Sequence, residues 1–536
     1  MKTALIQAPV WGTREPPLGL VQLSGCLKSR GLPVKSFDLN NFLYRNRFSG
    51  VETSWAWEQS GLWYESRWVD SFFREFSGVI SDFTERILEY GPGIAGFSVS
   101  SSTYQASIRL AKILRERSDK VTLILGGPAF IDKQFIERAF RESPADFLIQ
   151  GEADNLFPRL VKSICQGKDP GSVRGLYFRK GDGTGYTGPE PPVENLDKLP
   201  YLDFSDLRID GYDDKVHISM MSSRGCVWKC VFCSTRAFSS GYRSMSAERM
   251  HQEITWHRIN HYDRERKDNM EHVDFADLEI NGDPGRLEEF CELMIKYPPC
   301  SFLPEMKWVA NAIVHPSLTR GLLRKMAFAG CKKLIFGLES GSDRVLRLMR
   351  KQYDPALAMK VIRDAWEAGI EVTANFMFGF PGETREDFQK TLDFIKETGK
   401  YLERVYPSRT CCAVEEHSVL HKDPERFGIR TPVEHHLYWE TIDGENTYPL
   451  RVEKCAEFER FCLGIGVRVD RGVGTTVEMD RLYSLGFYYD YMGNSGEAAR
   501  YFQEYLKADP DNSTVRKRLR ELKGDTLPDA EEENRK

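Results

Sequence analysis

The chain has 536 residues, of which 29% are charged, and its formal net charge is −5 at pH 7. One hydrophobic core rarely serves more than about 250–300 residues, so we expect several domains. Acidic and basic residues are mixed along the chain, which argues against the basic surface of a nucleic-acid-binding protein. The start does not resemble an export signal, and no apolar run approaches the ~18–20 residues of a membrane span. We therefore expect a soluble, cytoplasmic protein with reduced thiols.

The first 165 residues alternate short apolar runs with helical stretches. The apolar runs end in small or polar residues and cover 3–10, 33–40, 93–102, 121–130 and 145–154. This alternation predicts a doubly wound, Rossmann-like parallel sheet, in which ligands bind at the carboxyl ends of the strands. No Gly-x-Gly-x-x-Gly follows the first strand, so NAD is not the expected ligand. The loops at the strand ends suit another nucleotide-like ligand or a corrin.

Residues 166–214 are predicted to link this domain to the next one. They contain a Gly-Asp-Gly turn at 181–183 between two strand-like arms, followed by the proline-rich stretch "GPEPPVENLDKLP". These signals predict a hairpin and then an extended linker. We expect the segment to strap two large domains together.

Three cysteines, Cys226, Cys230 and Cys233, lie within eight residues. Thiolate sulfur is a soft ligand that suits zinc or iron–sulfur iron. A structural zinc site is closed by four ligands, commonly two Cys-x-x-Cys pairs, and this spacing does not provide them. Three thiolates instead suit a cubane 4Fe-4S cluster with one iron left open for a substrate or cosubstrate.

The Cys-x3-Cys-x2-Cys spacing, with aromatic Phe232 before the last cysteine, resembles the radical S-adenosylmethionine (SAM) superfamily. In that family the open iron chelates the amino and carboxylate groups of SAM. An electron from the reduced cluster then splits a C–S bond and yields a 5′-deoxyadenosyl radical. The resemblance implies a 4Fe-4S cluster, SAM and an external electron donor such as flavodoxin or ferredoxin.

The chain after the cysteines continues to alternate strands and helices. Strand-like runs cover 216–221, 272–280, 306–312, 332–339 and 371–380, and amphipathic runs cover 247–259, 285–297, 316–330 and 355–369. Gly330 and Gly369 stand where helix C-caps belong. The pattern predicts a parallel sheet with helical crossovers. The resemblance makes residues 215–405 a partial (β/α) TIM barrel.

Three stretches resemble the SAM site of the superfamily. "FGLESGSDRVLRLMRK" places Glu339 near a SAM polar group, expected to be the ribose, and "NFMFGFPGET" places Gly379 and Pro381 near the adenine. "DFADLEINGD" lacks the Gly-Gly-Glu that grips the methionine amino group, so Asp277, or alternatively Asn281, would substitute for it. The residues implied in SAM binding are Phe232, Asp277, Glu339, Ser340, Asn375, Gly379 and Pro381.

The loops of the first domain, "PPLGL…GFSVSS…LGGP…GEAD", resemble the cobalamin-binding domain that precedes many radical SAM domains. All ten histidines lie at 217 or beyond, so this domain offers none to cobalt, and the lower cobalt face would meet water, nothing or another side chain. The alternative is a Rossmann-like domain without a corrin. The residues implied in cobalamin binding are Leu18, Ser98, Ser100, Ser101, Gly126, Gly127, Pro128, Gly151 and Glu152.

The C-terminal part has three predicted segments. Residues 406–475 would close the barrel and shape the substrate pocket; His435, His436, Tyr438 and Trp439 are candidate substrate contacts or ordinary surface cover. Residues 476–524 follow the tetratricopeptide pattern of a helical hairpin, which either packs on the barrel or docks a protein partner. The pattern rests on Leu485, Gly486, Tyr489, Ala498, Phe502 and Pro510. The acidic tail 525–536 is predicted to be disordered.

The favoured function is a cobalamin-dependent radical SAM enzyme that methylates an unactivated carbon. One alternative is a cyclase or rearrangement enzyme of the same architecture. Another is a methylthiotransferase, but this needs a second cluster, and only Cys26 and Cys165 precede Cys226. A non-catalytic scaffold is the third. No catalytic side chain is assigned, and the substrate is left open among a peptide, a lipid, a tetrapyrrole and a small natural product.

Overall fold

A computed structural model of the protein describes residues 1–46, 55, 57–181, 183–213, 217–239, 241–261, 271–300, 305–471 and 475–524. The predicted disordered tail lies outside the described residues. The chain divides into two compact units. The first comprises Met1–Cys226, Ala237–Ala310 and Phe328–Cys331, and the second comprises Val227–Arg236, Asn311–Ala327 and Lys332–Lys536.

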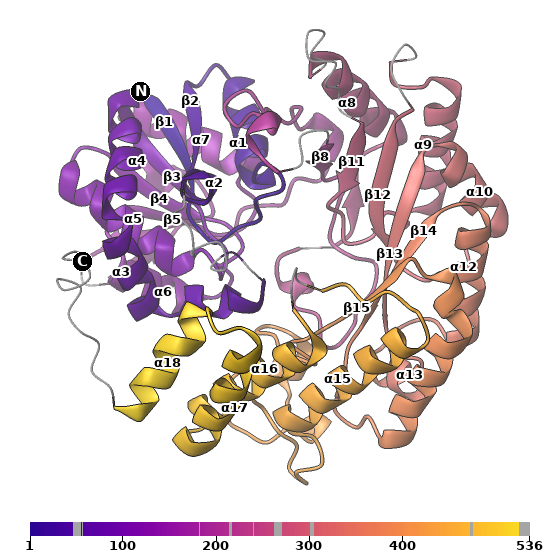
Figure 1. The fold of residues 1–536 in the computed structure, drawn as a ribbon. Coiled ribbons are helices and arrows are strands. Elements are labelled where there is room, and N and C mark those ends of the chain that lie inside the picture. Colours follow the sequence, from indigo (N-terminus) through magenta and orange to yellow (C-terminus); the bar gives the residue numbers. More distant parts are fainter. Residues whose placement is uncertain are drawn as a thin grey trace. The chain divides into compact units, whose positions relative to one another are not determined.

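The first unit contains a seven-stranded sheet with the order β2-β1-β3-β4-β5-β6-β7. Figure 1 labels its first five strands, β1 to β5. The first five strands pair in parallel, as the apolar runs predicted. The strands are β1 (Lys2–Gln7), β2 (Val34–Asp38), β3 (Pro92–Ser98), β4 (Thr122–Gly126), β5 (Phe147–Ile149), β6 (Leu176–Lys180) and β7 (Gly183–Tyr186). Five of the six β1 residues are buried, as expected for a central strand covered on both faces.

The predicted Gly-Asp-Gly hairpin is β6 and β7. It does not stand free in a linker, because β6 pairs antiparallel with β5 and so extends the first sheet. Helices join the parallel strands, and the core includes Trp63, Phe72 and Phe83 from the segment between β2 and β3. The helices are α1 (Leu18–Lys28), α2 (Leu39–Arg45), α3 (Ser66–Glu75), α4 (Ser77–Tyr90), α5 (Tyr104–Arg117), α6 (Lys133–Glu142) and α7 (Ala153–Cys165).

A second sheet has the strand order β15-β14-β13-β12-β11-β8. Strands β8, β11 and β12 pair in parallel, and so do β13, β14 and β15. A small antiparallel pair, β9 with β10, flanks the cysteine motif. The strands are β8 (His217–Met220), β9 (Ser223–Arg224), β10 (Arg243–Ser244), β11 (His272–Phe275), β12 (Lys307–Ala312), β13 (Cys331–Glu339), β14 (Glu371–Phe376) and β15 (Arg404–Pro407).

The helices between these strands begin at N-caps that the sequence supplies. The side chains of Ser246, Asp283 and Asp354 each accept a hydrogen bond from the first turn of their helix. Gly330 and Gly369 have φ values of 90° and 88°, which confirms both predicted C-terminal glycines. The helices are α8 (Ala247–Asn260), α9 (Pro284–Lys296), α10 (Arg320–Phe328), α11 (Asp343–Leu348), α12 (Pro355–Glu367) and α13 (Arg385–Thr398).

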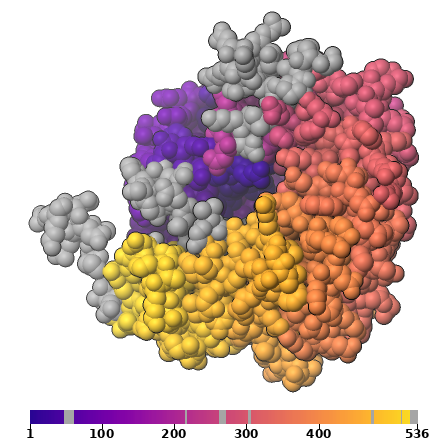
Figure 2. All heavy atoms as spheres, turned by 45° about the vertical axis from the view of Figure 1, so that its right-hand side comes forward, coloured from indigo at the N-terminus to yellow at the C-terminus, as the bar shows by residue number. Residues whose placement is uncertain are grey.

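The C-terminal part is mostly helical and reaches the molecular surface (Figure 2, yellow). Helices α16 and α17 pack as the predicted hairpin, with Ala498 and Phe502 fully buried. A Cβ on Gly486 would lie 2.5 Å from the Phe502 ring, which explains the small residue there. The helices are α14 (Val419–Lys422), α15 (Tyr448–Gly464), α16 (Val477–Tyr491), α17 (Ser495–Ala508) and α18 (Ser513–Lys523).

The described residues also form 3-10 helices: η2 (Trp57–Tyr64), η3 (Pro170–Ser172), η4 (Leu196–Lys198), η5 (Ile209–Gly211), η6 (Thr235–Ala237), η7 (Gly399–Tyr401) and η8 (Glu425–Phe427). Among the described residues, every helix falls short of the length and apolar character that a bilayer crossing requires. The predicted class, a Rossmann-like α/β sheet followed by a second parallel sheet and a helical C-terminal region, is confirmed. The predicted domain boundaries stay predictions.

Candidate functional site

The entry to the cysteine motif depends on one glycine. Gly225 precedes Cys226 and has a φ of 80°, in the left-handed region. A Cβ at this position would lie 2.2 Å from the carbonyl oxygen of Gly241, so no larger residue fits without displacing the backbone. The pairing of β9 with β10 holds the segment before Cys226 against the segment after Gly241. It thereby fixes the position of Cys226, which ends the first segment of the first unit.

Asp277 holds the start of the same loop through hydrogen bonds. Its carboxylate accepts hydrogen bonds from the backbone N–H groups of Ser222 and Ser223, both at 2.7 Å, and from the Ser222 hydroxyl. Arg286 donates to the Ser222 carbonyl at 3.1 Å. Burial raises the pKa of Asp277 to about 6, against the effect of these hydrogen bonds. The structure thus gives Asp277 a role in positioning the loop, and its contact with SAM stays a prediction, as does that of buried Asn281.

The other two cysteines lie in the second unit. Cys230 is buried and Cys233 half-buried; between them, Val231 donates its N–H to the Met349 carbonyl and accepts from Leu420, both at 3.1 Å. The Cys233 thiol contacts the Thr235 hydroxyl. Burial raises the pKa of Cys230. Cys226, Cys230 and Cys233 each offer one sulfur atom, and this donor set fits a cluster that takes three thiolate ligands.

Glu339 ends strand β13 with a φ of 67°, an unusual value for a residue other than glycine. Its carboxylate Oε1 accepts a hydrogen bond from the Lys351 ammonium at 3.2 Å. Ser340 is buried in the following turn, where its hydroxyl accepts from the Ser342 N–H at 3.1 Å. Asn375 is half-buried on the neighbouring strand, opposite Gly337 in the register. The strand ends therefore bring three of the predicted SAM residues into adjacent strands and turns.

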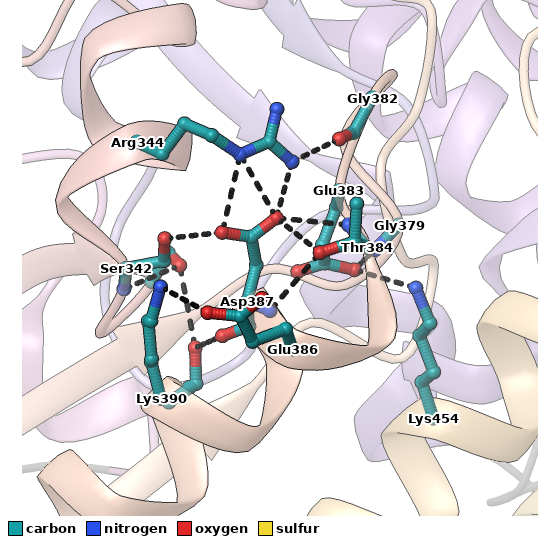
Figure 3. A network of polar contacts seen from close by, with 12 residues as sticks. Ser342, Arg344, Gly379, Gly382, Glu383, Thr384, Glu386, Asp387, Lys390 and Lys454 are labelled. Carbon is teal, nitrogen blue, oxygen red and sulfur yellow. Dashed lines mark hydrogen bonds and ion pairs between the residues drawn. The ribbon is translucent and has the colours of Figure 1, made fainter.

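The turn after β14 carries Gly379 and the buried Pro381. Gly379 has a φ of 72°, and its N–H donates to Glu383 Oε2 at 2.8 Å. Lys454 donates to the same oxygen at 2.9 Å (Figure 3). A Cβ on Gly379 would lie 2.2 Å from Cγ of Arg451, so glycine is required here by packing as well as by φ. These contacts hold the turn in place, and its contact with the adenine of SAM stays a prediction.

Asp387 organises the start of the next helix, α13 (Figure 3). Its carboxylate accepts from Ser342 at 2.7 Å, from the Thr384 N–H at 3.0 Å and from the Arg344 guanidinium. Burial alone would raise the pKa of Asp387, but Arg344, Ser342 and Thr384 lower it well below the usual value. Through Ser342 the network ties the turn after β13 to the turn after β14.

The first unit contains a pocket of about 490 Å³ at the carboxyl ends of its parallel strands. Six of the predicted cobalamin residues line it: Ser98, Gly126, Gly127, Pro128, Gly151 and Glu152. Leu18, Ser100 and Ser101 do not line it. None of the described lining residues is a histidine. The lining combines small residues, such as Gly126 and Gly127, with apolar side chains, such as Ile124 and Ile149.

Glu152 in this pocket is held by two arginines. Its carboxylate accepts from Arg224 at 2.9 Å and from Arg243 at 2.5 Å. Arg224 also forms a two-point contact with Asp154, at 2.8 and 2.9 Å. Glu152, a predicted cobalamin residue, therefore lies in the pocket wall, and the two arginines compensate its negative charge. Arg224, which stands two residues before Cys226, was missed because its partners lie some 70 residues away in sequence.

The candidate substrate contacts of the C-terminal part differ in their surroundings. Trp439 is buried, donates to the Cys412 carbonyl at 2.8 Å, and lies 3.9 Å beneath the Arg451 guanidinium, so it is part of the core. His435 stacks on Tyr438 with ring centroids 4.0 Å apart and on His436 at 4.7 Å. Burial lowers the pKa of His435 to about 4, so it is neutral at pH 7. Their contact with a substrate stays a prediction.

Residues 220–395 match the Radical SAM superfamily. They form a radical SAM domain. The resemblance drawn from the cysteine spacing is thereby confirmed, and the domain implies a 4Fe-4S cluster and SAM. An uncharacterized methyltransferase of Pyrococcus horikoshii is 28% identical over 59% of this chain and 67% of its own length. An anaerobic magnesium-protoporphyrin IX monomethyl ester cyclase of Synechocystis is 25% identical over 58% of this chain and 61% of its own length.

Solved structures share the fold of nearly the whole chain. The radical SAM methyltransferase TsrM from Kitasatospora setae, with cobalamin and a [4Fe-4S] cluster bound, matches with a TM-score of 0.64 over 94% of this chain and 100% of its own, at 13% identity. The cobalamin-dependent radical SAM enzyme OxsB matches with a TM-score of 0.63 over 97% of this chain and 74% of its own, at 15% identity. The architecture predicted around the radical SAM domain is therefore confirmed as a fold.

Proposed function

We propose that the protein is a cobalamin-dependent radical SAM enzyme that transfers a methyl group to an unactivated carbon. The observation that carries this proposal is the 490 Å³ pocket, which six predicted cobalamin residues line in the unit preceding the cysteine motif. The likeness to TsrM, which binds cobalamin and is a methyltransferase, supports it. The electron donor would be an external protein such as flavodoxin or ferredoxin.

When bound, the reduced cluster and SAM supply the 5′-deoxyadenosyl radical, and the corrin supplies the methyl group. The chain contributes thiolate ligands from Cys226, Cys230 and Cys233. Asp277 holds the loop that carries the first of these ligands. Glu339 offers a carboxylate from the end of β13. Radical chemistry needs protection from water, to which the buried Trp228 and Val231 of the cysteine motif would contribute.

The turn after β14 would receive the adenine through its backbone. Glu383 and the Arg451 side chain hold Gly379 in one conformation, so the turn needs little rearrangement when SAM arrives. Preorganisation of this kind orients the reacting bond before the electron arrives. Arg224 and Arg243 hold Glu152 in the wall of the corrin pocket, so that the pocket edge and the strand before Cys226 move together.

The test is anaerobic reconstitution of the full chain with iron and sulfide, followed by addition of hydroxocobalamin, SAM and a reductant. The proposal predicts about four irons per chain, the visible spectrum of a bound corrin, 5′-deoxyadenosine and methylcobalamin. Protein that binds the cluster and cleaves SAM but never takes up hydroxocobalamin would contradict the cobalamin part.

A second candidate is a cyclase or rearrangement enzyme of the same architecture. The similarity to anaerobic magnesium-protoporphyrin IX monomethyl ester cyclases favours it. The same reconstitution separates the two, because a cyclase would yield 5′-deoxyadenosine without methylating cobalt. A methylthiotransferase is disfavoured, since Cys26 is fully buried and burial raises its pKa to about 11, which leaves one exposed N-terminal cysteine for a second cluster.

A further inference from the structure

Lys351 is a buried cation beside the cysteine motif. The sequence patterns assigned it no role. Lys351 stands three residues after the end of α11, and 7% of its side chain is exposed. Its ammonium donates hydrogen bonds to the Gly337 carbonyl at 2.8 Å and to Glu339 Oε1 at 3.2 Å. Both acceptors belong to the end of β13, so Lys351 fixes the carboxylate that is expected to meet SAM.

The same ammonium faces the cysteine motif. It lies 5.5 Å from the ring centroid of Trp228 and 5.6 Å from that of Phe232, within the range of cation–π contacts. These aromatic residues flank Cys230 in the sequence. Trp228 in turn stacks on Tyr353 at 5.7 Å. One cation therefore contacts both the loop that carries two thiol ligands and the strand end that carries Glu339.

A buried ammonium is costly unless negative charge compensates it. Burial alone would lower the pKa of Lys351, but Glu339 and the thiol groups outweigh it and raise the pKa above its ordinary value. Lys351 is therefore charged at neutral pH. A cluster ligated by thiolates becomes more negative on reduction, and charges near an iron–sulfur cluster shift its reduction potential.

We propose that Lys351 is a positioning residue of the SAM site, which orients Glu339 and offsets the negative charge of the thiolate-ligated cluster. The inference rests on the radical SAM part of the proposed function and is independent of cobalamin. Since a nearby positive charge stabilises the reduced state, Lys351 makes the cluster easier to reduce. Through Glu339 it also strengthens SAM binding.

The experiment compares reconstituted full-length wild-type protein with Lys351→Met, Lys351→Arg and Tyr353→Phe. The Tyr353 hydroxyl donates to the Leu338 carbonyl at 2.5 Å, so Tyr353→Phe removes a neighbouring hydrogen bond on the same strand without changing charge. Iron and sulfide content establish cluster loading. An anaerobic redox titration followed by electron paramagnetic resonance gives the midpoint potential, and isothermal titration with SAM gives its Kd.

Lys351→Met should shift the midpoint potential to a more negative value and raise the Kd of SAM about tenfold, which corresponds to ~1.4 kcal/mol. Lys351→Arg should restore the potential, and Tyr353→Phe should leave it unchanged. If Lys351→Met loads no cluster, Glu339→Gln gives the opposite test, because losing the carboxylate should shift the potential to a more positive value in the absence of SAM.

An unchanged potential in fully loaded Lys351→Met protein, or an equal shift in Tyr353→Phe, would overturn the inference. So would a Glu339→Gln potential that does not rise. These outcomes are distinct from failure of the proposed function, in which the wild-type protein itself would bind no cluster or leave SAM intact.

Discussion

Replacing Arg224 by methionine tests whether the ion pairs beside the 490 Å³ pocket stabilise the first unit. The Arg224 guanidinium donates to Glu152 at 2.9 Å and to Asp154 at 2.8 and 2.9 Å. Its side chain is 16% exposed and that of Asp154 only 6%. Methionine keeps the apolar bulk but leaves the Asp154 carboxylate without this cation.

Removing one partner of a buried ion pair costs about 3–5 kcal/mol. Glu152 retains Arg243 at 2.5 Å and the Val193 N–H at 2.8 Å, so the loss falls mainly on Asp154. We therefore expect the free energy of unfolding to fall by about 3 kcal/mol, the lower end of this range. Arg224→Lys should give an intermediate loss, since an ammonium cannot make the two-point contact with Asp154.

The matched control is Arg208→Met. Arg208 makes a similar two-point contact with Asp210 in the same unit, but its side chain is 71% exposed. An exposed pair contributes roughly 0–1 kcal/mol, so this variant should remain close to the wild type. Urea titrations followed by circular dichroism give both values. If Arg224→Met is no less stable than Arg208→Met, the structural role assigned to the Arg224 pairs is wrong.

Three further predictions concern the loop and turns of the radical SAM domain. Gly225→Ala should reduce iron loading severalfold, because its Cβ would meet the Gly241 carbonyl oxygen at 2.2 Å; loading equal to wild type would contradict the fit. The folded pKa of Asp277 is about 6, above its usual 3.8, so its contribution to stability is greatest below pH 4 and is lost as pH rises through 6. The stability advantage of wild type over Asp277→Asn should thus fall by roughly 2 kcal/mol between pH 4 and 7, at ~1.4 kcal/mol per pKa unit, and urea titrations showing a rise would contradict it. Asp387 behaves oppositely, because Arg344 and its other donors lower its pKa; its contribution is present at pH 7 and lost as pH falls below 4, so Asp387→Asn should be clearly destabilised only at the higher pH.

Sequence patterns predicted most strands because each is a short apolar run with a glycine, a proline or polar residues at its ends. The run at 3–10 covers all but the first residue of β1, and the run at 371–380 contains β14. The four-residue strand β15 was not assigned, since its half-buried pattern is too short to show a period. The hairpin at 176–186 was predicted, but its pairing with β5 was not, because such pairing depends on tertiary structure.

The site divides in the same way. Cys226, Cys230 and Cys233 carry a spacing that is visible in sequence. Arg224 and Lys351 belong to no motif that is visible in the sequence, because each acts through partners from other elements of the fold. Asp277 was predicted as a SAM contact because it stands where the resemblance places Gly-Gly-Glu, whereas its hydrogen bonds to the loop backbone became visible only in the structure.

The most direct test of the account is SAM cleavage by the anaerobically reconstituted protein, measured as 5′-deoxyadenosine by mass spectrometry. Wild-type protein with a reductant should form 5′-deoxyadenosine, and a variant with Cys226, Cys230 and Cys233 all replaced by alanine should form none while remaining folded. Equal 5′-deoxyadenosine formation by the two proteins, or none from wild-type protein that carries a full cluster, would contradict the claim that these three thiolates assemble a radical SAM centre.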